Sequence, residues 1–142
     1  MEPYDAIKLE NQLCFPFYAI SREIIKKYKP VLDPFHLTYT QYITMLVLWE
    51  NESITFKELG QKLHLDSGTM TPVIKKLEQM NLVNKYRTKE DDRVVVVELT
   101  EQGRSLKEEI VKVPEAMACQ MHLEPEEMAQ LKKLLDKMLQ QF

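Results

Sequence analysis

Hydrophobic residues recur at helical spacing along most of this chain. The first such segment has one apolar face, formed by Leu13, Phe17, Ile20 and Ile24. We expect this helix to run to about Tyr28, because Pro30 and Pro34 follow and a proline inside a helix removes a backbone hydrogen bond. The last segment, which should start at Pro125, carries a similar face formed by Met128, Leu131, Leu135, Met138, Leu139 and Phe142. Both ends of the chain are therefore predicted to be amphipathic helices.

Polar residues mark where the helices between these two ends begin. The run TYTQ at residues 38–41 is a capping box that opens a strongly apolar helix, and the run TFKE at residues 55–58 opens a short one. Asp66 and Ser67 are favourable N-cap residues for a further helix, whose apolar face holds Val73, Leu77 and Met80. The short helix and the helix after Asp66 have the spacing of a helix-turn-helix. Thr100 should cap one more helix, which Pro114 should kink or end.

Two runs rich in β-branched residues follow the helix-turn-helix. They are Leu82–Arg87 and Val94–Leu99, and the loop between them, Thr88–Arg93, is too polar to be buried. This pattern predicts a hairpin with a charged tip. A helix-turn-helix followed by such a hairpin is a winged helix-turn-helix, so we expect a mainly α fold of the α+β type.

The terminal helices need a partner for their apolar faces. A winged helix-turn-helix at residues 38–103 can bury its own core, whereas residues 1–37 and 104–142 would keep apolar faces uncovered. We therefore expect these terminal regions to form a dimerisation region within one compact domain. A two-fold dimer suits a protein that reads paired half-sites about 34 Å apart. The alternative is that the terminal helices fold back on their own subunit.

Composition is that of a globular protein of one domain. The chain has 142 residues, of which 44% are hydrophobic and 29% are charged. It has no apolar run long enough to span a membrane, and its first residues, MEPYDAIKLE, lack the basic and apolar regions of a signal peptide. We therefore expect a cytoplasmic protein without a membrane partner, whose two cysteines start out reduced.

Charge is unevenly distributed along the chain. The net charge of −3 argues mildly against nucleic-acid binding. However, cationic residues gather in the helix after Asp66 and in the predicted wing: Lys75, Lys76, Lys85, Arg87, Lys89 and Arg93. The start of that helix is short and polar: Ser67, Gly68, Thr69 and Thr71. Such residues would let the backbone approach a DNA groove, where the N–H groups of a helix start attract phosphate. The alternative is an ordinary solvated surface.

Cys14 has two interpretations. It lies among Leu13, Phe15 and Phe17, where a thiol could pack as a small, inert hydrophobic group. A reactive thiol instead needs a stabilised thiolate, and hydroxyl donors that point at the sulfur provide that stabilisation. The residues around Cys14 are compatible with both.

Three sequence blocks make the chain similar to a known family. They are LENQLCFPFYAISRE at residues 9–23, LTYTQYITMLVLWE at 37–50 and LDSGTMTPVIKKLE at 65–78, with the wing sequence DDRVVVVELTEQG at 91–103 as a more general signature. Over essentially its whole length the chain resembles the MarR family of regulators, and within it the organic-hydroperoxide-sensing OhrR type. The resemblance implies an intertwined homodimer that binds an inverted repeat in double-stranded DNA and usually represses a peroxidase gene. It also implies that the helix from Ser67 enters the major groove, while Arg93, supported by Asp91, reaches the minor groove.

The same resemblance implies a sensing chemistry. Tyr28 and Tyr39 match the tyrosines that support the thiolate in this branch, and Tyr18 joins the neighbouring network. Cys14 would then attack the O–O bond of an organic hydroperoxide and become a sulfenic acid. Cys119, in the run VPEAMACQM, matches the resolving thiol that the opposite subunit supplies in two-cysteine members. Without that resolution, a small cellular thiol could cap Cys14 instead.

Two residues depart from the family pattern. Pro16 stands two residues after Cys14, where relatives continue the helix, so we expect a kink at the sensor. His64 stands where relatives often have tyrosine, and we expect it to pack beside the helix from Ser67. The three histidines lack ligand spacing with cysteines or carboxylates, so we expect no metal site, and no motif predicts a bound cofactor.

Two other functions would use parts of the same sequence. A thiol peroxidase would also need a reactive cysteine, but it has no need of a basic wing, so we do not expect an enzyme. A MarR-type repressor that responds to a ligand would keep the DNA surface and bind a small aromatic acid between the arms of the dimer. DNA release by such a ligand in a protein without both cysteines would favour that alternative.

Overall fold

The computed structural model describes residues 2–142 and is mainly helical with one small sheet. Its helices and strands, in chain order, are α1 (Cys14–Leu32), α2 (Tyr39–Asn51), β1 (Ser53–Thr55), α3 (Phe56–Leu63), α4 (Ser67–Gln79), β2 (Val83–Arg87), β3 (Val95–Leu99), α5 (Glu101–Ile110), α6 (Val113–Ala118) and α7 (Pro125–Leu139). Short 3-10 turns lie at Asp5–Ile7, Leu9–Asn11 and Asp33–Phe35. This order of elements confirms the predicted fold class.

The predicted polar residues cap the helices. Thr38 and Gln41 form the full capping box at the start of α2, with backbone-to-side-chain distances of 3.3 and 3.0 Å. Thr55 accepts from the amide of Glu58, 3.1 Å away, at the start of α3. Thr100 accepts from the amide of Gly103, at 2.9 Å, at the start of α5. These local hydrogen bonds explain why the sequence located the helix starts well.

Two prolines act differently from expectation. Helix α1 does not end near Tyr28 but continues through Pro30 to Leu32. Pro30 stands in the last turn of α1. Leu32, the last residue of the helix, is 1% exposed and anchors this end of α1 in the core. Pro16 is the third residue of α1 and does not interrupt it, because the first N–H groups of a helix have no partner within the helix. The kink expected at Pro16 is therefore wrong.

The sheet has three antiparallel strands in the order β1-β3-β2. Ile54 of β1 lies opposite Val97 of β3, and Lys85 of β2 lies opposite the same residue on the other side. The two predicted wing strands are confirmed to within one residue at their starts. Strand β1 was not expected, because its three residues are too few to show the alternation of a strand.

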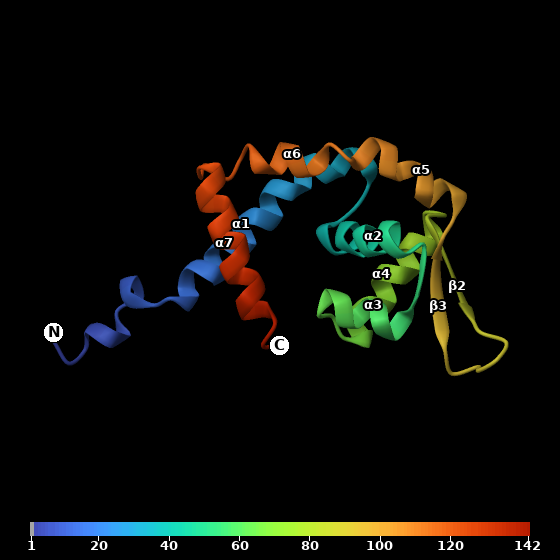
Figure 1. The fold of residues 1–142 in the computed structure, drawn as a ribbon, viewed down its shortest axis with the longest axis horizontal. Helices are drawn as coiled ribbons and strands as arrows, with labels where there is room; N and C mark the ends of the chain where they lie inside the picture. Colours follow the sequence, from blue (N-terminus) through green and yellow to red (C-terminus); the bar gives the residue numbers. More distant parts are fainter. Residues whose placement is uncertain (1) are drawn as a thin grey trace.

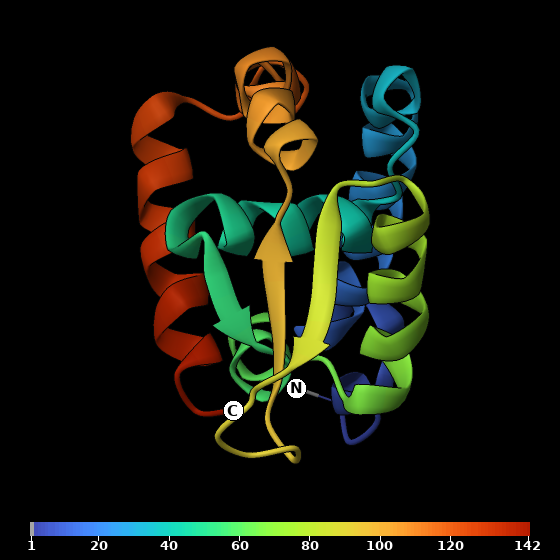
Figure 2. The ribbon, with the colours of Figure 1, turned by 90° about the vertical axis from the view of Figure 1, so that its right-hand side faces the viewer.

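The main hydrophobic core lies between the sheet and helices α2, α3 and α4 (Figure 2). Its centre is fully buried and is formed by Met45, Leu48, Leu59, Met70, Ile74, Leu77 and Val97, each 0% exposed. We refer to α2, β1, α3, α4, β2 and β3 together as the reading unit. Burial of this apolar face is the main force that holds the helix-turn-helix against the wing.

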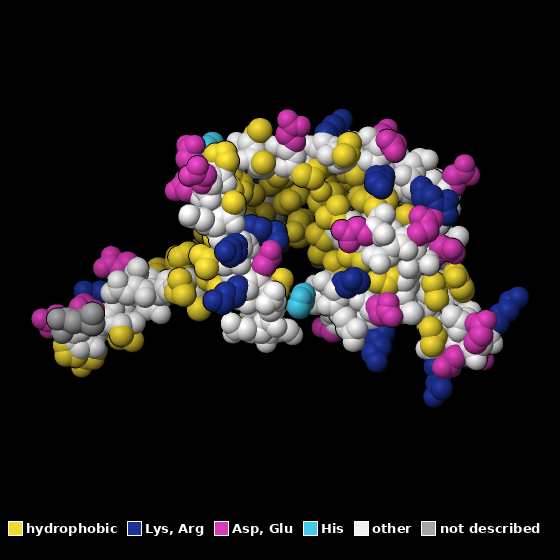
Figure 3. Space-filling model, viewed as in Figure 1, with side chains coloured by type: hydrophobic (Ala, Val, Ile, Leu, Met, Phe, Trp, Pro, Cys, Tyr) yellow, Lys and Arg dark blue, Asp and Glu magenta, His cyan; other side chains and the backbone are white. Residues whose placement is uncertain are grey.

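The remaining helices form an arch beside the reading unit. Helices α5 and α6 run along one side of it, α1 packs against α6 and α2, and α7 turns back from the far end (Figure 1). Apolar side chains line the inside of this arch (Figure 3). Helix α7 has no buried residue, and Leu13, just before α1, and Ile20, within it, are 74% and 55% exposed. The terminal helices thus fold back on their own subunit only in part, and their uncovered faces are those for which we expect a second subunit.

Helix α5 is fixed tightly to the reading unit at its start. The indole N–H of Trp49 donates to the carbonyl oxygen of Gly103, with a donor–acceptor distance of 2.9 Å. Gly103 is buried against the carbonyl of Leu82, and a Cβ added to it would lie 2.2 Å from that oxygen. Only glycine permits this approach of α5 to the turn between α4 and β2.

Candidate DNA interface and thiol sensor

The start of α4 presents short polar side chains to solvent. Ser67, Gly68, Thr69 and Thr71 are all exposed. Asp66 caps the helix by accepting from the amide of Thr69, 2.7 Å away, and this hydrogen bond lowers the pKa of its carboxyl group. The hydroxyl of Thr71 donates back to the carbonyl of Ser67 at 2.7 Å. Because a carboxylate already occupies the helix start, the expected attraction of phosphate by its N–H groups is weaker than the sequence suggested.

The wing is organised by a pair of charged side chains. Arg93 donates to Asp91 through its backbone amide at 3.0 Å and through two guanidinium nitrogens at 3.1 and 3.3 Å. These bonds lower the pKa of the Asp91 carboxyl group, while the side chain of Arg93 stays 91% exposed. Arg87 braces the loop differently, by donating to the backbone carbonyl of Asp92 at 2.7 Å. The geometry thus places Asp91 against Arg93, in line with what the family resemblance implied, and it gives Arg87 a bond within the wing.

The wing tip and the start of α4 lie at the same end of the molecule (Figure 2). Lys75 and Lys76 are exposed farther along α4, and Lys89 is exposed in the wing loop. Several cationic side chains project from this end of the reading unit (Figure 3). The residues predicted to contact DNA therefore share one accessible region, although they come from separate parts of the sequence.

Cys14 is exposed in this chain, so it is not the buried, inert thiol of the first interpretation. It is the first residue of α1 and follows the short turn at Leu9–Asn11. Tyr18 lies one turn further on; the residue is 60% exposed, and its hydroxyl oxygen accepts from Arg22 at 3.1 Å. Cys14 and Tyr18 thus lie on the same face of α1, since residues four apart in a helix are neighbours.

The other two predicted tyrosines form a pair elsewhere. The ring of Tyr28, near the end of α1, lies 4.7 Å from the ring of Tyr39, at the start of α2, measured between centroids. Sequence reasoning missed a third member, Tyr42, whose centroid lies 5.8 Å from that of Tyr28 and 6.4 Å from that of Tyr39. Its spacing of three residues from Tyr39 on one helix was the available signal.

Burial keeps these phenols protonated. Desolvation, together with the neighbouring Tyr39 and Tyr42, raises the pKa of Tyr28 from 10.0 to about 12. Desolvation also raises the pKa of Tyr39, and it raises the pKa of Tyr42 together with the adjacent Tyr39. The hydroxyl groups of Tyr28 and Tyr39 therefore remain hydrogen-bond donors throughout the pH range in which a thiol ionises.

One chain does not bring Cys14 to the tyrosine pair. Cys14 and Tyr28 stand at opposite ends of the same helix, and a rise of 1.5 Å per residue separates positions 14 and 28 by about 21 Å. Cys119, the residue after α6, is likewise exposed and carries a free thiol. The structure therefore brings together Tyr28 with Tyr39, and Asp91 with Arg93, but it does not assemble a sensor from the residues of a single subunit.

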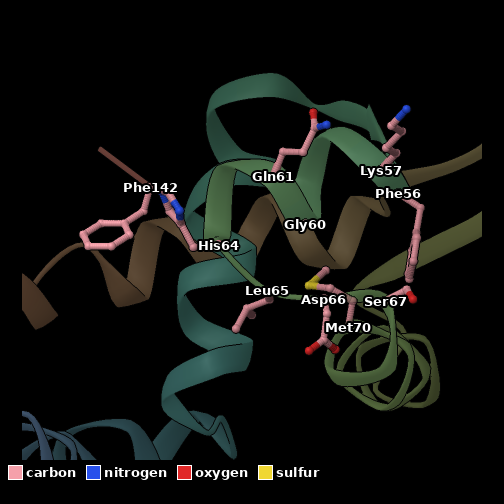
Figure 4. Close-up of a pocket in the computed structure, with 10 residues that line it drawn as sticks. All are labelled: Phe56, Lys57, Gly60, Gln61, His64, Leu65, Asp66, Ser67, Met70 and Phe142. Carbon is pink, nitrogen blue, oxygen red and sulfur yellow. The ribbon is translucent and has the colours of Figure 1, made fainter. Parts of the chain in front are cut away.

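A groove of about 710 Å³ opens beside the helix-turn-helix (Figure 4). It lies between α3, the start of α4 and the last residue of the chain, with His64 close to Phe142 (Figure 4). His64 ends α3 in a left-handed conformation, with φ of 54°. It is exposed and borders the turn before Ser67, and its expected packing beside the helix from Ser67 stays a prediction. Within residues 2–142 there is no group of three or more metal-binding side chains, and no helix there is long and apolar enough to cross a membrane.

Comparisons with known proteins agree with this architecture. The model of the transcriptional regulator SarA/Rot family matches residues 26–110. The chain belongs to this family of transcriptional regulators. The organic hydroperoxide resistance transcriptional regulator of Bacillus subtilis is 47% identical over 137 residues, which cover 96% of this chain and 93% of that protein. The regulator SarZ of Staphylococcus saprophyticus is 42% identical over 127 residues, covering 89% and 87%. The predicted resemblance to the organic-hydroperoxide branch of MarR-type regulators is confirmed.

Solved structures extend the comparison to the redox states of a relative. Reduced AbfR bound to DNA superposes on this regulator with a TM-score of 0.81 at 31% identity, over 99% of this chain and 98% of that one. The disulfide form of AbfR gives a lower TM-score of 0.68 at 32% identity, with 95% of each chain covered. This regulator therefore has the shape of the reduced, DNA-bound relative more closely than that of the disulfide form.

Proposed function

We propose that this regulator binds an inverted-repeat operator as a homodimer and releases it when an organic hydroperoxide oxidises Cys14. The observation that carries the proposal is the placement of both thiols on the helical arch, outside the reading unit that presents α4 and the wing. This separation allows a chemical signal at one end to change the relative position of two DNA-reading surfaces. AbfR, a structural relative with solved DNA-bound and disulfide forms, supports it.

The interface with DNA would use α4 and the wing. The short side chains from Ser67 to Thr71 would enter the major groove, with Lys75 and Lys76 as phosphate contacts. The side chain of Arg93 would reach the minor groove, since it is 91% exposed and Asp91 holds its guanidinium in place. Lys89 would add positive charge at the wing tip. The bond from Arg87 to the wing backbone favours a supporting role for that residue beside any phosphate contact.

The sensor would be completed by the second subunit. Tyr28 lies about 21 Å from Cys14 along the same helix, and Tyr39 packs against Tyr28, so the two tyrosines that support the thiolate would have to come from the opposite chain. The uncovered apolar faces of α1 and α7 supply the surface for such a dimer. Protonated phenols would then donate hydrogen bonds to the sulfur and stabilise its thiolate form. Tyr18, one turn from Cys14, would border the same site.

The reaction would proceed in two steps. The thiolate of Cys14 attacks the terminal oxygen of the hydroperoxide, the O–O bond breaks, and the alkoxide leaves as an alcohol after taking a proton, which converts Cys14 to a sulfenic acid. The thiolate of Cys119 from the opposite subunit then attacks this sulfur, so that a disulfide forms and water leaves. The hydroperoxide is the oxidant that is reduced, and two cellular thiol groups would later return the disulfide to two thiols by exchange, themselves becoming a disulfide.

A disulfide is better suited to the switch than a sulfenic acid alone. A change from almost fully bound to almost fully free needs a bias of about 5.5 kcal/mol between two conformations. A sulfenic acid alters one polar group, whereas a covalent bond requires Cα atoms within about 7 Å and thus moves both helices when they start farther apart. The movement of α6 would pass to the reading unit through α5, because the contacts of Gly103 fix the start of α5 to the reading unit.

A gel shift on the promoter beside the regulator's own gene tests this function. The reduced protein should retard the DNA, cumene hydroperoxide should release it, and a non-reducing gel should show a cross-linked dimer. Cys14→Ser is the matched control and should bind the DNA but ignore the peroxide. If Cys14→Ser still releases DNA on peroxide treatment, the sensor role of Cys14 is wrong.

The groove in Figure 4 favours a second candidate, a repressor that responds to a small aromatic acid. Aromatic residues and two cationic or titratable side chains border it, namely Phe56, Phe142, Lys57 and His64, beside the start of α4. A ligand bound there could alter how α4 meets the groove of DNA. Release of DNA by an aromatic acid from a variant lacking both cysteines would support this candidate. If aromatic acids release no DNA and only peroxide does, from the wild type, the candidate is excluded. Steady consumption of peroxide with a reductant would instead indicate a thiol peroxidase.

A further inference from the structure

The tyrosine pair packs on a third tyrosine that has no part in the chemistry above. Tyr42 is 2% exposed and lies within the hydrophobic core. Its ring contacts the rings of both Tyr28 and Tyr39, at centroid distances of 5.8 and 6.4 Å, and it meets them at interplanar angles of 41° and 52°. Tyr28 and Tyr39 themselves are only partly buried. Tyr42 therefore lies beneath the pair, on its core side.

We infer that Tyr42 is a positioning residue of the sensor, whose buried ring fixes the orientation of the Tyr28 and Tyr39 rings and thereby the point at which their hydroxyl groups converge. This inference rests on the proposed function, in which those hydroxyl groups support the Cys14 thiolate. Tyr42 itself would not touch the sulfur or the hydroperoxide.

The need for such a residue follows from the geometry of hydrogen bonds. The two hydroxyl donors come from different helices, α1 and α2, yet they have to reach one sulfur atom. Hydrogen bonds prefer angles above about 150° and weaken steeply below about 120°, so a tilt that turns either hydroxyl away from the sulfur would weaken the support. The rings of Tyr28 and Tyr39 have more room to tilt than a core ring, because both residues are only partly buried in the subunit.

Tyr42 is suited to prevent that tilt. It extends from α2 three residues after Tyr39, on the same face, and reaches the ring that α1 supplies. Close packing of the core around it leaves its ring little freedom, unlike the two rings above it. Aromatic rings in tilted contact also prefer a limited set of geometries, so a fixed ring restricts its neighbours.

The pH dependence of Cys14 alkylation tests the inference, since only the thiolate reacts. The rate of reaction with iodoacetamide is measured against pH in the full-length homodimer with Cys119→Ser, so that Cys14 is the reacting thiol. Tyr42→Phe keeps the ring and should keep the midpoint. Tyr42→Leu removes the ring and should move the midpoint upward by about one pH unit, which corresponds to about tenfold slower alkylation below the midpoint.

Two further measurements separate the possible outcomes. Tyr42→Met fills much of the same volume without a planar ring, and it replaces Tyr42→Leu if circular dichroism shows that the leucine variant does not fold. A folded Leu or Met variant with an unchanged midpoint overturns the inference, because a residue that only fills the core would lower stability alone. An upward shift in Tyr42→Phe equal to that in Tyr42→Leu also overturns it, since the hydroxyl would then be the acting group.

Reference variants distinguish this failure from failure of the proposed function. Tyr28→Phe and Tyr39→Phe each remove a hydroxyl that should support the thiolate, so each should raise the midpoint. If neither raises it, the tyrosine-supported sensor itself is wrong. If both raise it while the folded Tyr42 variants do not, only the positioning role of Tyr42 is wrong.

Discussion

Replacement of Gly103 by alanine should destabilise the whole reading unit. The added Cβ would lie 2.2 Å from the carbonyl oxygen of Leu82 and 3.1 Å from both its carbon and a methyl group of Leu99. The nearest of these atoms belongs to the backbone of the turn between α4 and β2, so it cannot move aside as the end of a side chain would. Either α5 or that turn has to shift by about 1 Å to restore an ordinary contact.

The magnitude follows from three contributions. Overpacking of this kind costs about 1–3 kcal/mol. The shift would also weaken the hydrogen bond from Trp49 to Gly103, which is 2.9 Å long, at a cost of about 1 kcal/mol. Alanine opposes these losses by about 1 kcal/mol, because it is a better helix former than glycine. We therefore expect Gly103→Ala to lower the free energy of unfolding by about 1–3 kcal/mol, which is a large part of a typical domain stability of about 5–15 kcal/mol.

Urea unfolding followed by tryptophan fluorescence measures this loss. Trp49 is the single tryptophan of the chain and lies at the altered contact. The protomer concentration has to be equal in all samples, because the stability of a dimer depends on it. The midpoint for Gly103→Ala should fall by about 1 M urea, given slopes of about 1–3 kcal/mol per molar.

Gly68→Ala is the matched control, since it makes the same chemical change in another helix. There the added Cβ would meet only a side-chain oxygen of exposed Asp66, at 3.3 Å. This variant should unfold at the same or a higher urea concentration than the wild type, because alanine favours the helix. If Gly103→Ala unfolds together with Gly68→Ala, the fixed joint between α5 and the reading unit does not exist as described.

Three further predictions concern the interface and the sensor. Arg93→Ala and Lys75→Ala should each weaken operator binding and reduce the slope of log affinity against log salt by about 0.9, and unchanged slopes in both would exclude the proposed docking on DNA. Cys119→Ser should lose the cross-linked dimer on a non-reducing gel and accumulate overoxidised Cys14, measured by mass spectrometry, whereas a retained cross-link would mean that another route joins the subunits. Because the pKa of Tyr28 is raised from 10.0 to about 12, the stability gained by keeping its phenol neutral is complete below pH 10.0 and is lost as the pH rises toward 12, so Tyr28→Phe should lose less stability over that interval in alkaline urea titrations.

Local signals in the sequence determined much of the secondary structure. Thr38, Thr55 and Thr100 cap the helices where they were expected to, because a capping side chain bonds to an amide only three residues away. The wing strands followed from two runs of β-branched residues around a polar loop. The candidate residues Cys14 and Cys119 also came from the sequence, although only through their resemblance to a family, since a thiol in an apolar run has no distinctive local pattern.

The tertiary structure decided what depends on residues far apart in the chain. Strand β1 exists because β3 pairs with it, and α1 passes through Pro30 because Leu32 is held in the core. The spacing of Tyr42 from Tyr39 puts both residues on one face of α2, but the contact of the Tyr42 ring with Tyr28 depends on how α1 packs against α2. The separation of Cys14 from Tyr28 by the length of α1 likewise became visible only in three dimensions. In the proposed sensor, Tyr28 would therefore come from a second chain, since a rigid helix cannot fold its two ends onto each other.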